Sequence, residues 1–189
     1  MWMPDKPYND LPALPPVANV ETPAILKACI TASRHLAALH ASADLLPNRH
    51  ILTNTLPLME AQASSEIENI VTTADELFRY AAVENTDTFP PALKEAFGYR
   101  KAVRHGVDML VEQRPLCTNT AVELCRVLRS NHAGIRSTPG CCLRNQATGQ
   151  VVYTPPEGES LIREKLANWE QFMNGHTDID PLIRLAVGH

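Results

Sequence analysis

The stretch TPAILKACITASRHLAALHASA, residues 22–43, decides the fold class of this protein. Thr22 belongs to the residue types that cap helices, and proline, here Pro23, is favoured at the first helical position. Apolar residues then recur three or four positions apart, which is the spacing of one helix face: Ile25, Cys29, Ala32, Leu36, Leu39 and Ala43. We therefore predict a helix that begins after Thr22 and ends before Pro47-Asn48.

Helical patterns continue through most of the chain after this stretch. We predict a helix from about Arg49 to Ser65 that Pro57 interrupts, and a short one after the capping box that begins at Thr73. Further helices are expected over residues 91–112, 118–131, 157–174 and from Asp180-Pro181 onward. Residues 1–20 are rich in proline and predict an extended arm that lies across the domain.

One segment, at about residues 140–156, has a different pattern. Two short β-favouring runs flank the turn-like sequence Asn145–Gly149, and Pro155-Pro156 closes the segment, so it predicts a hairpin. The fold class is therefore mainly α with one small β-hairpin. An exposed hairpin edge can accept an extended segment of another protein by strand addition. The alternative is an ordinary connecting hairpin that covers the helical core.

Composition limits the classes of function. The chain has 189 residues, of which 44% are apolar, and a formal net charge of −4, which gives no overall reason to bind nucleic acid. No apolar run approaches the roughly 20 residues that cross a bilayer, and no secretory signal is evident, so no membrane partner is expected. The five cysteines are odd in number and include the adjacent Cys141-Cys142, which indicates reduced thiols and a cytoplasmic location.

Familiar catalytic signatures are missing: the sequence contains no GxSxG, GxxxxGK[ST], HExxH or GxGxxG, and its seven histidines are scattered singly. The acidic segment Ser64–Asn69 stands out. Its carboxylates, Glu66 and Glu68, point to different sides of a helix and do not form a paired-carboxylate catalyst. Glu68 could sit at a helix end that Asn69 terminates, and there it could pair with an arginine or remain a solvated acid.

Several motifs, in register over nearly the whole chain, resemble those of Fic-domain proteins. They are Leu46-Pro47-Asn48, Glu60–Ile70, Thr72–Phe78, Tyr99-Arg100, Ile135-Arg136, Tyr153–Glu159 and Asp180–Ala186. The resemblance implies a Fic-like helical bundle whose hairpin is the family's flap. It divides the chain into a proline-rich arm (1–20), a Fic N-terminal region with the inhibitory helix (21–89), and the start of a Fic core (90–189) that includes the flap.

Fic proteins transfer AMP from ATP to a hydroxyl side chain of a target protein, with magnesium as cofactor. The family's inhibitory motif is Ser or Thr, three residues, Glu, then Gly or Asn, and it is matched here by Ser64, Glu68 and Asn69. By similarity, Glu68 would pair with an arginine of the catalytic loop and block the γ-phosphate position of ATP. Val152, Tyr153 and Thr154 of the flap would lie beside the target segment or the nucleotide.

The sequence departs from the family at the catalytic motif HxFxDGNGR, which it does not contain. His189 matches instead the histidine that precedes Tyr-x-Phe-Glu in the family pattern. The resemblance therefore assigns no catalytic residue and implies a chain truncated before that loop, inactive alone and without productive ATP and Mg²⁺ binding. Exposed apolar helix faces are then expected unless a homo-oligomer covers them. The alternative is an antitoxin-like regulator that lends Glu68 to a separate Fic core.

Overall fold

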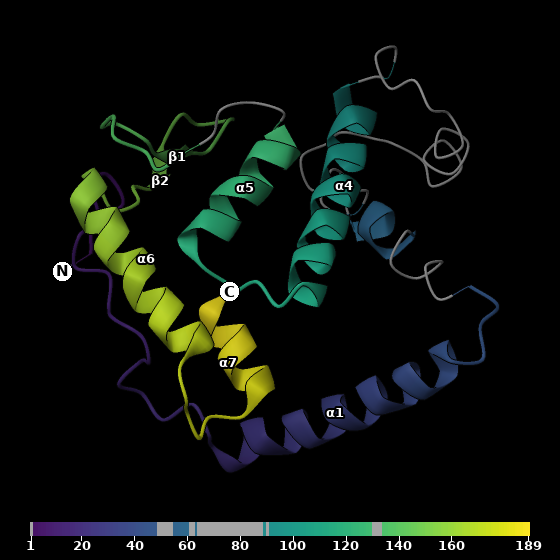
Figure 1. Ribbon diagram of the computed structural model, residues 1–189. Coiled ribbons are helices and arrows are strands. Elements are labelled where there is room, and N and C mark those ends of the chain that lie inside the picture. The colour runs from purple at the N-terminus through teal and green to yellow at the C-terminus, as the bar shows by residue number, and fades with distance from the viewer. Residues whose placement is uncertain (1, 49–54, 61–62, 64–88, 90, 130–133) are drawn as a thin grey trace. The chain divides into compact units, whose positions relative to one another are not determined.

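The computed structural model describes residues 2–48, 55–60, 63, 89, 91–129 and 134–189. Over these residues the chain is mainly helical, with one antiparallel hairpin of two short strands (Figure 1), so the predicted fold class is confirmed. The elements with full bounds are α1 (Pro23–Ala43), α4 (Pro91–Val111), α5 (Thr118–Arg129), β1 (Leu143–Arg144), β2 (Val151–Tyr153), α6 (Glu159–Asn174) and α7 (Pro181–Gly188). Residues 55–60 are also helical.

Internal contacts divide the chain into two compact units. Unit 1 comprises Met1–His35, Leu116–Thr118 and Gly134–His189, and unit 2 comprises Leu36–Pro115 and Asn119–Ala133. The hairpin, α6 and α7 belong to unit 1, whereas α4 and nearly all of α5 belong to unit 2. The predicted boundaries of a Fic N-terminal region and a Fic core, at residues 20 and 89, stay predictions.

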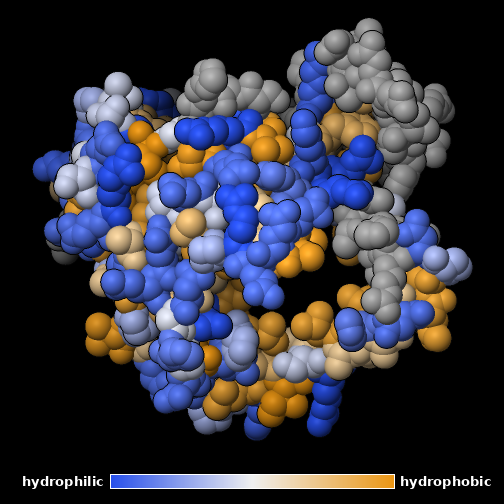
Figure 2. All heavy atoms as spheres, viewed as in Figure 1, coloured by the Kyte–Doolittle hydropathy of each residue, from blue (hydrophilic) through white to orange (hydrophobic). Residues whose placement is uncertain are grey.

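The first predicted helix is confirmed as α1, together with its cap. The hydroxyl oxygen of Thr22 accepts a hydrogen bond from the amide of Ile25 at 3.4 Å, as a capping threonine does. Cys29 is the buried residue of this fully described helix. Its other apolar side chains are largely exposed, among them Ile30 and Leu36 at 54% and 57%. In Figure 2 orange, apolar side chains accordingly line α1.

Close helix packing forms the centre of unit 2. A Cβ atom added to Gly98 of α4 would lie 3.0 Å from the carbonyl oxygen of Leu128 in α5, so the two backbones meet closely there. On α4, a buried apolar cluster gathers Phe97 with residues from before the helix and from segment 55–60: Leu58, Phe89, Leu93, Ala96 and Phe97. The rings of Phe89 and Phe97 lie 5.4 Å apart in a tilted arrangement.

The starts of α7 and α6 differ in how well they follow the sequence signals. α7 begins as predicted, because Asp180 accepts a hydrogen bond from the amide of Leu182 at 2.8 Å and Pro181 occupies the first turn. α6 begins at Glu159, two residues after the predicted start, because Gly158 has a φ of 101° and stands outside the helix. Of the predicted helix over residues 49–65, positions 55–60 and 63 are described and helical. The one predicted after Thr73 lies outside the described residues.

Within unit 1, the N-terminal arm, purple in Figure 1, runs along α6. Contacts between α6 and α7 fix the end of the chain. The indole nitrogen of Trp169 donates to the carbonyl oxygen of Gly188 at 2.9 Å. A Cβ atom added at Gly188 would collide with the sulfur of Met173, so the flexible side chain of Met173 would have to shift to admit it.

Candidate functional site

The predicted inhibitory residues Ser64, Glu68 and Asn69 lie outside the described residues, and their roles stay predictions. The helical segment just before them is described, and it is attached to α4. The phenol of Tyr99 donates a hydrogen bond of 3.0 Å to a carboxylate oxygen of Glu60. Partial burial, and then this contact with Glu60, raise the pKa of Tyr99 above its usual value. Tyr99 and the Leu58 cluster thus hold the chain on the N-terminal side of the motif.

The hairpin forms around the turn that the sequence predicted. Leu143 pairs with Tyr153 and Arg144 with Val151, and the register shifts between these pairs. The side chain of Asn145 accepts hydrogen bonds from the amides of Ala147 and Thr148 at 2.9 and 3.1 Å. Asparagine is favoured in turns because its side chain can satisfy such amides. The strands are short, three residues in β2, so few ladder hydrogen bonds hold the hairpin together.

The three predicted flap residues differ in exposure. Val152 is 53% exposed, Tyr153 is half-buried, and Thr154 is 8% exposed. The hydroxyl of Thr154 donates to the carbonyl oxygen of Pro4 at 2.7 Å, and its own carbonyl oxygen accepts from the amide of Tyr8 at 3.0 Å. Of the three side chains, that of Val152 is therefore the most open to a partner, whereas the N-terminal arm occupies both oxygens of Thr154.

The segment between the hairpin and α6 is also fixed by polar contacts. The guanidinium of Arg136 donates to the carbonyl oxygen of Pro156 at 2.7 Å. The amide of Glu157 donates to the side-chain oxygen of Asn9 at 2.9 Å. Because Pro155 and Pro156 have no amide hydrogen and restricted backbone angles, a few such bonds suffice to set the direction in which the chain enters α6.

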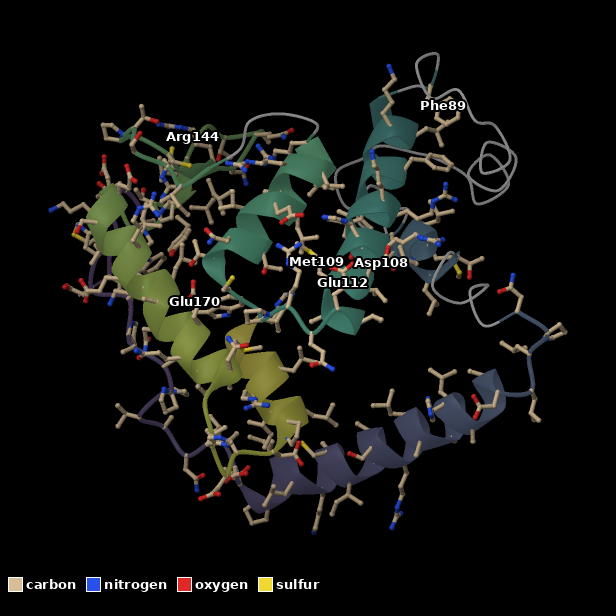
Figure 3. All side chains as sticks on the ribbon, viewed as in Figure 1. Phe89, Asp108, Met109, Glu112, Arg144 and Glu170 are labelled. Atoms are coloured by element: carbon tan, nitrogen blue, oxygen red, sulfur yellow. The ribbon has the colours of Figure 1, made fainter. Side chains whose placement is uncertain are left out.

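The C-terminal half of α6 holds the segment that leads into α5. A carboxylate oxygen of Glu170, labelled on α6 in Figure 3, accepts hydrogen bonds from the hydroxyl and the amide of Thr118. These bonds lower the pKa of Glu170, the hydroxyl contact contributing most. One turn later, Asn174 pairs with both backbone groups of Leu116: its amide nitrogen donates at 2.7 Å and its oxygen accepts at 3.2 Å.

A charged cluster in unit 2 was not anticipated from the sequence. Glu123 of α5 accepts from Arg114 at 2.7 Å and lies 2.8 Å from a ring nitrogen of His105 on α4. These hydrogen bonds, Arg114 first and His105 second, lower the pKa of Glu123 to about 2. The three residues are 9 and 18 positions apart in the sequence, and only the packing of α4 against α5 brings them together.

Beside the arm, α6 and α7 border a cavity of about 480 Å³. Its walls are mostly apolar, with Leu14 from the arm, Leu166 and Trp169 from α6, and Val187 from α7. The charged groups on its wall include Arg136 and Lys165, whose donors bond to the carbonyl oxygens of Pro156 and Leu11. This cavity is thus an apolar space between elements of unit 1.

The part of the chain that the structure describes contains neither a metal-ligand cluster nor a membrane-spanning helix. In these segments, no group of three or more His, Cys, Asp or Glu side chains is placed to hold a metal ion. Among the same residues, no helix has the length and apolar character needed to cross a membrane.

Comparison with known families gives one finding. Residues 26–108 match the family described as Fic/DOC family N-terminal, a range that runs from α1 through most of α4. The predicted resemblance is confirmed over this range, in which residues 26–108 match the N-terminal region of the Fic/DOC family.

Proposed function

We propose that the chain provides the regulatory region and the target-docking hairpin of a Fic-type protein adenylyltransferase. Such an enzyme transfers AMP from ATP to a hydroxyl side chain of a target protein. The observation that carries the proposal is the family match over residues 26–108, because this range includes Ser64, Glu68 and Asn69. A cytoplasmic location belongs to the same proposal and is supported by the odd number of cysteines.

In this function Glu68 is the inhibitory group. Its carboxylate pairs with an arginine of the catalytic loop and competes with the γ-phosphate of ATP for that guanidinium. The competition is physically sound, because carboxylate and phosphate both accept paired hydrogen bonds from the planar guanidinium group. Ser64 and Asn69 complete the sequence motif, and asparagine is a residue type that tolerates left-handed backbone at a helix end.

The hairpin is the docking element for an extended segment of the target. Strand addition uses main-chain hydrogen bonds, and side chains along the edge choose among partners. The exposed Val152 on β2 supports this role, since its side chain is available to a neighbouring segment. ATP and Mg²⁺ are the cofactors of the proposed activity. The residues that would hold them belong to HxFxDGNGR, which these 189 residues do not contain, so no transfer step is assigned to this chain.

A second candidate is a stand-alone regulator that inhibits a separate Fic core through Glu68, as an antitoxin does. It rests on the same motif residues, Ser64, Glu68 and Asn69, which lie in the matched range. The two candidates share the role of Glu68 but differ in whether the arginine that it meets lies on the same polypeptide. The coding sequence after codon 189 separates them. Continuation into HPFxDGNGR favours the first candidate, and a stop codon beside a gene for a Fic core favours the second.

The role of Glu68 is testable in a reconstituted assay. The purified chain, labelled ATP, Mg²⁺ and candidate target proteins are incubated with and without a Fic core that carries HxFxDGNGR. We expect no labelling by the chain alone and less labelling by the core when the chain is added. Glu68→Ala should abolish this inhibition, because no carboxylate remains to compete with the γ-phosphate.

The matched control is Glu66→Ala, which removes a carboxylate two positions away and should leave the inhibition intact. Equal inhibition by the wild-type chain and by Glu68→Ala would refute the role given to Glu68. Labelled target from the chain alone would refute the prediction that it is inactive by itself.

A further inference from the structure

The N-terminal arm is bonded to the hairpin exit and to α6 at five positions. These contacts join residues about 150 positions apart in the sequence, for example Pro4 and Thr154. The arm positions, each followed by its partner, are Pro4 with Thr154, Tyr8 with Thr154, Asn9 with Glu157, Leu11 with Lys165, and Leu14 with Asn168. The contacts are spread along the arm, so it is fixed over its length and not only at one end.

The chemistry of the arm explains why side chains hold it. A proline-rich segment has few amide hydrogens. The arm makes local backbone hydrogen bonds, such as those from the amides of Lys6 and Leu11 to the carbonyl oxygens of Met3 and Tyr8, but other carbonyl oxygens take donors from elsewhere. Thr154 supplies one to Pro4, and Lys165 supplies one to Leu11 at 2.5 Å. Asn168 pairs with both backbone groups of Leu14, at 2.7 and 2.9 Å, as a neighbouring strand would. The sequence of the arm and these three side chains are therefore complementary.

Thr154 is the centre of this arrangement. It follows directly after the last residue of β2, and it contacts the arm through both its hydroxyl and its carbonyl oxygen. It is also one of the few buried polar residues among those the structure describes. A buried hydroxyl that donates to a carbonyl oxygen is costly to remove, because the carbonyl oxygen is then left without its donor. The arm thus fixes the point at which β2 ends.

We propose that the arm, residues 4–14, is a clamp that fixes the hairpin exit through the positioning residue Thr154. A second consequence rests on the proposed docking function. A partner segment that adds to β2 cannot use the carbonyl oxygen of Thr154 while the amide of Tyr8 occupies it. The clamp therefore ends the pairing edge at Tyr153. Release of the arm would free the carbonyl oxygen of Thr154 as one more acceptor on that edge, and it would loosen the short hairpin.

The test is Thr154→Val, which keeps the branched shape and removes the hydroxyl. Two readouts follow the clamp directly: hydrogen exchange of the Tyr8 amide, measured by NMR, and the rate of limited chymotrypsin cleavage after Tyr8. Loss of one hydrogen bond of ordinary strength should raise the local opening equilibrium, and with it both rates, about fivefold. Exchange of the amides of α5 should stay unchanged, which distinguishes local release from general unfolding.

The matched control is Thr31→Val on α1. The hydroxyl of Thr31 donates only within its helix, to the carbonyl oxygen of Lys27, and is exposed. The substitution Thr31→Val should leave both rates at Tyr8, amide exchange and chymotrypsin cleavage, unchanged. Equal rates in Thr154→Val and Thr31→Val would overturn the proposal.

If Thr154→Val fails to fold, Asn168→Ala keeps the proposal falsifiable. It removes both bonds to Leu14 from a partly exposed position and should accelerate cleavage after Tyr8 in the same direction. Unchanged cleavage in Asn168→Ala would count against a clamp. Neither experiment contains a target or nucleotide, so their failure refutes the clamp and leaves the proposed Fic function to its own assay.

Discussion

Replacing Phe97 by alanine probes the core that holds the segment before the proposed inhibitory motif. Phe97 is 8% exposed, and its cluster includes Leu58, from the helical segment that precedes the motif. Its ring lies 5.4 Å from that of Phe89, and the guanidinium carbon of Arg100 lies 4.6 Å from its centroid. The substitution removes the apolar burial and both ring contacts at once.

The magnitude follows from these contacts. Truncation of a buried phenylalanine to alanine usually lowers the free energy of unfolding by about 3–5 kcal/mol. Phe97 keeps a little exposure, and its contact with Arg100 is partly solvated. We therefore expect Phe97→Ala to lower the free energy of unfolding by an amount in the lower half of this range, about 3–4 kcal/mol. In Phe97→Leu the leucine fills most of the space but loses the aromatic contacts. We expect this substitution to lower the free energy of unfolding by about 1–2 kcal/mol.

The assay is urea unfolding followed by far-UV circular dichroism, with the m-value checked for constancy. Val111→Ala is the control, since this residue of the same helix is 78% exposed and its substitution should change stability by less than about 0.5 kcal/mol. Both tryptophans, Trp2 and Trp169, belong to unit 1. Their fluorescence therefore reports whether the loss of stability in unit 2 extends to unit 1. If Phe97→Ala lowers the free energy of unfolding by less than about 1 kcal/mol, the assignment of this cluster as a core is refuted.

Two further predictions concern hydrogen bonds. The pKa of Glu123 is lowered from 4.5 to about 2, so its bonds stabilise the folded chain above about pH 4.5 and lose that effect as the pH falls toward 2. In Glu123→Gln this part of the acid dependence should disappear from melting temperatures measured between pH 2 and 6, and an unchanged profile would contradict it. Asp180→Ala removes the cap of α7 and should lower stability by about 1 kcal/mol in urea unfolding. Asp178→Ala, an exposed acid just before the cap, is its control and should match the wild type.

The fold was largely predictable from the sequence because its signals are local. Thr22 and Asp180 cap helices where the sequence placed them, and Asn145 forms the turn of the hairpin. The start of α6 was the error, by two residues, because Gly158 at a φ of 101° keeps Glu157 outside the helix. Periodicity recognises a helix well but locates its ends poorly when no capping side chain marks them.

The candidate site was predictable in part. The Fic/DOC match could be anticipated from the motifs themselves, since a family pattern is a property of the sequence. The role of Thr154 could not, because its partners Pro4 and Tyr8 are about 150 positions away. The same holds for Glu123, whose ordinary helix position gave no sign of Arg114 and His105. Side chains that act through distant backbone groups leave no periodic pattern.

The sequence by itself determined the described helices, the hairpin and the family match, because caps, turns, apolar spacing and motifs are all local in the chain. Only the tertiary structure decided which side chains meet. It placed the proline-rich arm along α6, assigned both oxygens of Thr154 to that arm, and left Val152 exposed on β2. The physical reason is that the proline-rich arm has local turn hydrogen bonds, such as that from the Leu11 amide to the Tyr8 carbonyl oxygen, but lacks the repeating hydrogen bonds of a helix or a strand. Its place is set by the donors and acceptors that another part of the fold presents to it.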